Sequence, residues 1–155
     1  PRIMESLPGI AARVPINLSE LIRYSRIAHR KHLIKAGKRV GLSARKDYAY
    51  YEKTFLPKAK ALLFFKNNSF CGLVVHFPRT GLFGDRQDYL AWHDDLSGMS
   101  PKEVNVAHQQ LAAWLKQTAK HRVSIFLTSR NNQMYKFCGE LGFVTSRVLF
   151  EKTKR

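Results

Sequence analysis

The sequence has few cysteines, few acidic residues and no long apolar run. Cys71 and Cys138 are the only cysteines among 155 residues, which excludes a disulfide framework, and they are not spaced as paired metal ligands. No apolar run approaches the roughly 20 residues that a membrane-spanning helix needs. The N-terminus, PRIMESLPGI, also lacks the apolar stretch of a secretory signal. These absences predict a cytoplasmic protein with reduced thiols in apolar surroundings.

Acidic side chains are scarce relative to basic ones. The chain has 27 Lys and Arg against 11 Asp and Glu, a formal charge of +16 at pH 7. Residues 1–60 hold 14 Lys and Arg against 4 acids, and residues 61–155 hold 13 against 7. Such a field attracts polyanions, so nucleic acid is the predicted partner class, with no membrane association. The alternative is that the charge serves solubility alone.

The composition is that of a folded protein. Hydrophobic residues make up 45% of the chain and aromatic residues 12%, which is enough for a core and excludes intrinsic disorder. There is no internal repeat or low-complexity segment. The length predicts a single domain over residues 1–155.

Periodicity and capping signals divide the chain into helices and strands. Asn17-Leu18-Ser19-Glu20 has the form of a capping box, and Ser100-Pro101-Lys102-Glu103 combines an N-cap with Pro at the first helical position. Two apolar runs around Asn67-Asn68 predict a hairpin, and Pro78 to Gly84 is expected to be a loop. The predicted strands are Arg2–Leu7, Ala59–Phe65, Ser69–Phe77, Gln87–His93, Val123–Thr128 and Phe143–Phe150, and the predicted helices are Leu18–Gly37, Ala44–Phe55, Pro101–Lys120 and Asn132–Leu141. The order β-α-α-β-β-β-α-β-α-β predicts an α/β (α+β) fold, with a mixed, mostly antiparallel sheet flanked by helices.

The C-terminal elements carry a more specific pattern. Ser129-Arg130-Asn131 follows a strand, and Leu141-Gly142-Phe143 closes the next short helix. This spacing resembles V…N-x-x-A-x-x-x-Y-x-x-x-G-F of the GNAT (Gcn5-related N-acetyltransferase) superfamily, and the element order resembles that family over nearly the whole chain. Gly142 is expected to adopt the left-handed conformation that ends a helix, and Phe143 to return the chain to the core. The resemblance implies a GNAT-like fold and acetyl transfer from acetyl-CoA to a primary amine.

The family's cofactor loop, Q/R-x-x-G-x-G/A, is missing. Glu103, Val106 and His108 occupy its three defining positions, and a carboxylate with two bulky side chains is a poor neighbour for a diphosphate. In another register, the helix start near Ser100 could supply backbone donors instead. The resemblance then implies the cofactor-binding residues Gly98, Ser100, Lys102 and Asn131.

The implied catalytic groups also depart from the family. Active members commonly have Tyr at the position of Cys138, where a general acid protonates the departing CoA thiolate. Cys138 is the candidate acid, with Tyr135 one turn earlier as a substitute, and a small buried thiol is the alternative reading. His93, at the end of a strand, is the candidate general base.

Basic residues of the first predicted helix form a stripe. Arg23, Arg26 and Arg30 lie three and four residues apart on one face, beside Lys31, and could meet phosphates. A solvated helix face is the alternative. His29 and His32 lack a neighbouring carboxylate or thiolate, so no metal site is expected.

Three functions remain open on the sequence. The first is an N-acetyltransferase with a diverged acetyl-CoA site. The second is a catalytically silent GNAT-like protein, similar to degenerate relatives in tailed bacteriophages, which would bind nucleic acid or virion proteins and reside in the virion. The third is a nucleic-acid-binding module of unrelated α+β fold, with Arg23, Arg26, Arg30 and Lys31 on phosphates.

Overall fold

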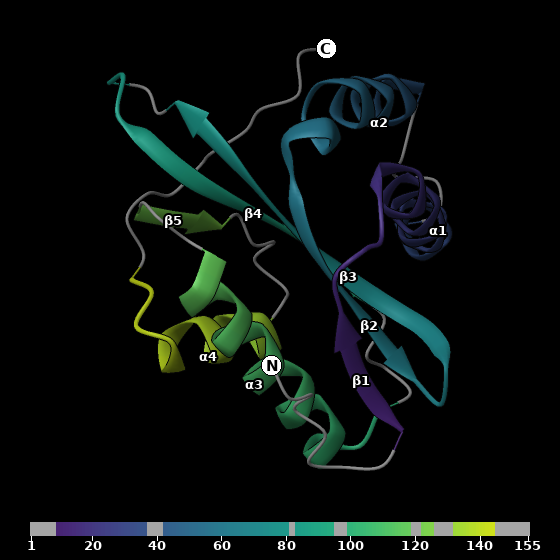
Figure 1. The fold of residues 1–155 in the computed structure, drawn as a ribbon, viewed down its shortest axis with the longest axis vertical. Helices are drawn as coiled ribbons and strands as arrows, with labels where there is room; N and C mark the ends of the chain where they lie inside the picture. Colours follow the sequence, from purple (N-terminus) through teal and green to yellow (C-terminus); the bar gives the residue numbers. More distant parts are fainter. Residues whose placement is uncertain are drawn as a thin grey trace.

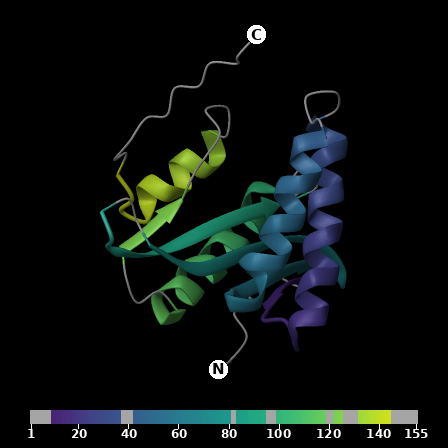
Figure 2. The same cartoon turned by 90° about the horizontal axis from the view of Figure 1, so that it is seen from above.

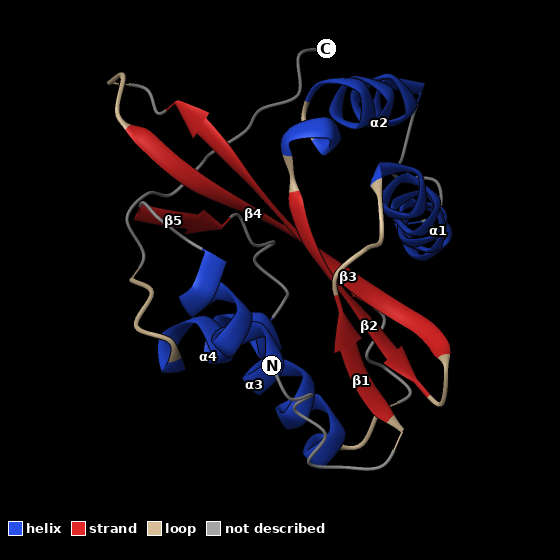
Figure 3. Cartoon of the chain, viewed as in Figure 1, coloured by secondary structure: helices blue, strands red, loops and turns tan. Residues whose placement is uncertain are grey.

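The central feature of the molecule is one twisted sheet. A computed structural model describes residues 9–36, 42–80, 83–94, 99–118, 122–125 and 132–144. Within them, five strands pair in the order β1-β2-β3-β4-β5 (Figures 1 and 3). The strands are β1 (Ile10–Arg13), β2 (Lys60–Lys66), β3 (Ser69–Thr80), β4 (Arg86–Asp94) and β5 (Arg122–Ile125). The helices are α1 (Leu18–Ala36), α2 (Leu42–Thr54), the 3₁₀ turn η2 (Leu56–Lys58), α3 (Pro101–Thr118) and α4 (Asn132–Glu140).

Strands β1 to β4 pair antiparallel, and β5 runs parallel to β4. Asn67 and Asn68 close the β2–β3 hairpin with φ angles of 49° and 65°. Two consecutive positive φ angles define the type I′ turn, whose twist matches that of the strands it joins. The predicted hairpin is confirmed.

Both sides of the sheet are buried. Along β2, Ala61 and Leu63 join one apolar cluster, while Leu62 and Phe64 join the other. Figure 1 shows α1 and α2 on one side of the sheet and α3 and α4 on the opposite side, and in Figure 2 α1 and α2 run side by side. We call the side of Leu63 the α1–α2 face and the side of Phe64 the α3–α4 face. Burial on both sides explains why these strands read as continuous apolar runs.

Helix residues complete the two clusters. The α1–α2 face is covered by Leu21, Ala28 and Leu56, and the α3–α4 face by Ala107, Leu111, Trp114, Leu115, Phe137 and Cys138. The α1 helix begins as predicted, because the Glu20 N–H donates to Asn17 Oδ1 at 2.9 Å. The returning bond differs from a standard capping box, since the Glu20 carboxylate accepts from the Ile16 N–H at 3.2 Å.

The α4 helix ends in a Schellman motif. Gly142 has φ 87°, its N–H donates to the Gly139 carbonyl at 3.1 Å, and the Phe143 N–H donates to the Cys138 carbonyl at 2.9 Å. Phe143 packs against the α3–α4 cluster. The predicted helix stop at Gly142 and the return of Phe143 to the core are confirmed.

The predicted mixed, mostly antiparallel sheet flanked by helices is confirmed, with differences in element boundaries. The observed first strand is Ile10–Arg13, while the predicted strand Arg2–Leu7 lies outside the described residues. Small residues in the middle of β1 give it no visible alternation. Of the final predicted strand, Phe143 and Val144 are described and are not in a strand, and the rest lies outside the described residues.

The loop prediction from Pro78 to Gly84 is wrong in its first half. Strand β3 continues to Thr80, and Pro78 pairs with Asp88 of β4. Among the described residues, β2 reaches only as far as His76, so beyond it β3 has a neighbour on one side. A strand tolerates a residue without an N–H at such a place. The single domain over residues 1–155 stays a prediction.

Candidate acyl-CoA site and basic surface

The N-terminus of α3 is capped by the side chains of its own first residues. The Glu103 N–H donates to Ser100 Oγ at 3.2 Å, and the Ser100 N–H donates to the Glu103 carboxylate at 2.8 Å. The Val104 N–H donates to the Ser100 carbonyl at 3.0 Å, and Pro101 has no N–H to offer. This reciprocal capping box uses most of the donors that would otherwise hold an anion at a helix start.

The capping box places the Glu103 carboxylate at the N-terminus of α3. Lys66, at the end of β2, donates to the Glu103 carboxylate at 3.1 Å. The Ser100 backbone N–H, and then the Lys66 ammonium, lower the pKa of Glu103, which keeps it ionised at neutral pH. Its negative charge interacts favourably with the helix dipole and would repel a diphosphate at the same place.

The positions matched to the family's glycine loop lie inside a regular helix. Glu103, Val106 and His108 all belong to α3, which begins at Pro101. Val106 and His108 are buried, and His108 stacks on Phe137 of α4 with ring centroids 4.0 Å apart. Burial lowers the pKa of the His108 imidazole, so it is neutral at pH 7. His108 packs α3 against α4, and none of the three matched positions offers the bare backbone of a glycine.

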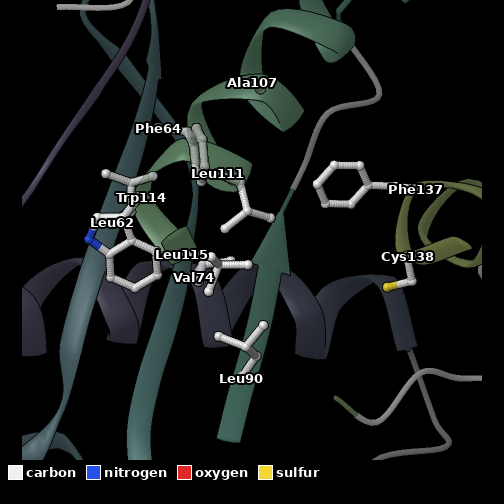
Figure 4. Close-up of a cluster of buried hydrophobic side chains, with 10 residues drawn as sticks. All are labelled: Leu62, Phe64, Val74, Leu90, Ala107, Leu111, Trp114, Leu115, Phe137 and Cys138. Atoms are coloured by element: carbon white, nitrogen blue, oxygen red, sulfur yellow. The ribbon is translucent and has the colours of Figure 1, made fainter. Parts of the chain in front are cut away.

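Cys138 lies on α4 in the apolar cluster of the α3–α4 face (Figure 4). Its side chain is among residues from α3, α4 and the sheet, and the residue is 7% exposed. Burial raises the pKa of the thiol, which makes it a weaker acid than a free cysteine. The surroundings are those of a packing residue.

The other implied catalytic and cofactor residues are only partly described. His93 lies on β4 opposite Leu73, and Tyr135 lies on α4. The structure describes the backbone of these two residues and not their side chains. Gly98 and Asn131 fall outside the described residues, while Lys102 is exposed in the first turn of α3. The structure thus brings Ser100 and Lys102 together at one helix start. The roles assigned to all these residues stay predictions.

A buried polar pair escaped the sequence analysis. His76 Nε2 of β3 lies 3.3 Å from Asp88 Oδ1 of β4, with side-chain exposures of 6% and 4%. The His76 ring meets Trp114 of α3 edge-on, at 6.1 Å between centroids. His76 reads as an isolated histidine in the sequence because the pair depends on the register between two strands.

The arginine stripe of α1 points away from the core. Arg23, Arg26 and Arg30 are exposed, while Leu21 and Ala28 on the opposite side of the helix are buried. Two hydrogen bonds, of 2.7 and 3.0 Å, join Arg26 to the Glu52 carboxylate of α2. These bonds lower the pKa of Glu52. The shared face predicted for the three arginines is present.

Three cations of this surface form no ion pair within the described residues. No ion pair joins Arg23, Arg30 or Lys31 to a described carboxylate. Several described acids are engaged elsewhere, because Glu20 pairs with Arg13, Glu52 with Arg26 and Glu103 with Lys66. These three exposed cations therefore contribute to the positive field of the chain without an ion pair.

Neither a group of metal ligands nor a membrane-spanning helix is found in the described part of the chain. No three His, Cys, Asp or Glu side chains in it are grouped as metal ligands. None of the helices within it combines the length and apolar character that crossing a bilayer requires.

Comparison with known proteins identifies the fold. No protein-family model matches this sequence, and a search of curated proteins gives no match. Solved structures match over almost the whole chain. A GCN5-related N-acetyltransferase from Ralstonia eutropha JMP134 superposes with a TM-score of 0.62 at 11% identity, covering 94% of this chain and 99% of that one.

Two further structures agree. A predicted acetyltransferase from Clostridium acetobutylicum, solved with acetyl-CoA, gives a TM-score of 0.61 at 11% identity, covering 93% of this chain and 96% of that one. An integron cassette protein of V. cholerae gives 0.57 at 12% identity, covering 95% and 93%. The chain has the GNAT fold. At these identities the likeness concerns the fold, and the residues at the start of α3 do not fit the acetyl-CoA diphosphate.

Proposed function

We propose that this protein is a divergent GNAT-fold domain that binds nucleic acid through α1 and does not transfer acetyl groups. The observation that carries the proposal is the exposed stripe of Arg23, Arg26 and Arg30, in which Arg23 and Arg30 form no ion pair with a described carboxylate. Arginines three and four residues apart on one helix face can meet successive phosphates. The affinity supplied in this way is electrostatic and independent of sequence.

The start of α3 supports the non-catalytic part of the proposal. Acetyl-CoA would bring a diphosphate to backbone donors that Ser100 and Glu103 already occupy, beside an ionised carboxylate. Opening the site would break the capping box and the Lys66–Glu103 ion pair. A buried Cys138 with a raised pKa is, in addition, a poor proton donor to a thiolate.

An N-acetyltransferase with a diverged cofactor site is the second candidate. The observation that favours it is the likeness over 93% of this chain to a structure solved with acetyl-CoA. In that case Lys102 would hold the cofactor, and His93 and Tyr135 would serve as base and acid. A place in a phage virion, with virion proteins as partners, is a narrower form of the first proposal and stays a prediction.

Two titrations of the nuclease-treated full chain separate the candidates. One measures the heat of acetyl-CoA binding by calorimetry, and the other the anisotropy of fluorescein-labelled DNA at about 50 and 200 mM salt. We expect no cofactor heat and a DNA affinity that falls steeply with salt. Arg23→Gln and Arg30→Gln should each reduce the slope of log K against log salt by about 1, while exposed Arg86→Gln on β4 serves as the matched control.

The outcomes are distinct. Saturable micromolar binding of acetyl-CoA overturns the non-catalytic part and makes Tyr135→Phe and His93→Ala the next variants to assay. The absence of DNA binding at low salt overturns the nucleic-acid part. Equal salt slopes for the α1 variants and for Arg86→Gln would remove α1 as the contact surface.

A further inference from the structure

Three aromatic rings meet where α1 crosses the β2–β3 hairpin. Tyr24 of α1 lies 5.6 Å from Phe65 of β2, with the rings perpendicular, and 4.6 Å from Phe70 of β3. Phe65 and Phe70 are 6.0 Å apart. All three side chains are half-buried, so each keeps part of its ring at the surface. We call Tyr24, Phe65 and Phe70 the aromatic triad.

Each ring of the triad carries a cation. Arg13 lies over Phe65 at 5.1 Å from the ring centroid, Arg23 over Tyr24 at 5.2 Å and Lys31 over Phe70 at 5.9 Å. Lys31 also donates to the Phe70 carbonyl at 3.5 Å. These contacts hold three long side chains against the triad, which reduces the conformational entropy they would lose on meeting a phosphate.

A second aromatic group on the same face behaves differently. Tyr51, Phe55 and Phe77 also contact one another, but no described cation lies over their rings. Phe77 is buried, and burial raises the pKa of Tyr51 well above its usual range. This group is packing. The triad differs from it in having no fully buried member and a cation over each ring.

We propose that the aromatic triad and its three cations bind single-stranded nucleic acid. Unpaired bases would stack on the exposed parts of Tyr24 and Phe70 or on the guanidinium plane of Arg23, and the phosphates would meet Arg23 and Lys31. A duplex hides its base faces, so the triad favours single strands over duplexes. This inference rests on the proposed nucleic-acid function and names its ligand class.

The test compares ligands of one length on the full chain. Labelled oligothymidine, oligouridine and a DNA duplex are titrated by anisotropy at one salt concentration. We expect both single strands to bind more tightly than the duplex, and the two single-strand arms reveal any preference between DNA and RNA. Phe70→Leu, which keeps apolar volume and removes the ring, should weaken single-strand binding about tenfold. Phe83, 84% exposed and outside the triad, provides the control Phe83→Leu, expected to bind like wild type.

A measurement on the unmodified chain guards against misfolding of the variant. Oligonucleotides containing 5-bromouracil are photocrosslinked to the wild-type protein, and the crosslinked peptide is identified by mass spectrometry. We expect the crosslink at Tyr24 or Phe70. Crosslinks confined to residues outside the triad and its three cations would overturn the inference.

The inference and the proposed function fail in different ways. Equal affinity for duplex and single strand, with Phe70→Leu binding like Phe83→Leu, removes the stacking role and leaves electrostatic binding by α1 intact. Loss of binding to every nucleic acid tested removes both.

Discussion

On the α3–α4 face of the sheet, polar side chains are buried. His76 and Asp88 pair inside the core, His108 stacks on Phe137, and the Cys138 thiol lies among apolar residues. On the α1–α2 face, the cations of α1 point into solvent or lie across half-buried rings. Cations and half-buried rings lie side by side on this second face, which is why we propose a ligand surface there.

The largest expected effect tests whether both faces contribute comparably to stability. Leu63 and Phe64 are neighbours on β2 and are both buried, on opposite faces. We expect Phe64→Ala to lower the free energy of unfolding by about 3–5 kcal/mol and Leu63→Ala by about 2–5 kcal/mol, because each leaves a cavity. Urea unfolding measures both. A loss below about 1 kcal/mol for either variant would mean that its face is loosely packed.

The buried pair on the α3–α4 face comes next. Asp88→Ala should cost about 3 kcal/mol, because it leaves His76 in the core without the carboxylate. The double change His76→Leu with Asp88→Leu should recover part of that loss, since no polar group is then stranded. A double-mutant cycle by urea unfolding gives the coupling. Additive effects would mean that the two side chains do not interact.

Removing a helix N-cap on each face should have a smaller effect on stability. Asn17→Ala at α1 and Ser100→Ala at α3 should each cost about 1 kcal/mol, since each removes an acceptor for a helical N–H. Thermal unfolding measures both costs. We expect Ser100→Ala to gain no acetyl-CoA binding by calorimetry, because the Glu103 carboxylate remains. If Ser100→Ala did bind acetyl-CoA, the Ser100 cap alone would be what prevents binding in the wild type.

The smallest effect concerns pH. Glu20, Glu52 and Glu103 have pKa values lowered by their partners, so the folded state holds their protons less tightly than the unfolded state. Their stabilisation is complete above the unfolded pKa, near 4.5, and is lost as pH falls through the folded values. Glu103→Gln should flatten this acid limb in urea unfolding between about pH 5 and pH 3. An unchanged loss of stability on acidification would mean that other carboxylates cause it.

Local features of this fold were predictable from the sequence. The Asn17 cap, the Asn67-Asn68 turn and the Gly142 helix stop each depend on a few consecutive residues. Strand β1 was not found, because Ile10 is held by pairing with Lys66, far along the chain. Gly9 shows the same dependence: its φ is 86°, and a Cβ there would overlap the Asn67 side chain.

The candidate sites divide in the same way. The shared face of Arg23, Arg26 and Arg30 follows from helical spacing alone and was predicted. The aromatic triad was not, because its rings come from three elements that only the tertiary fold brings together. Strand register likewise decides the His76–Asp88 pair. The chemistry of His93 and Tyr135 rests on family resemblance and stays a prediction.

The order of the strands in the sheet equals their order in the chain, which has a consequence for folding kinetics. Strands β2, β3 and β4 are joined by short connections, so their contacts close small loops and can form early. Pairing of β1 with β2 must close the chain across α1 and α2 and comes later. We therefore expect substitutions in the β2–β3–β4 meander to slow folding and substitutions in β1 mainly to speed unfolding. The aromatic triad needs α1 docked on β2 and β3, so we expect it to form after the meander.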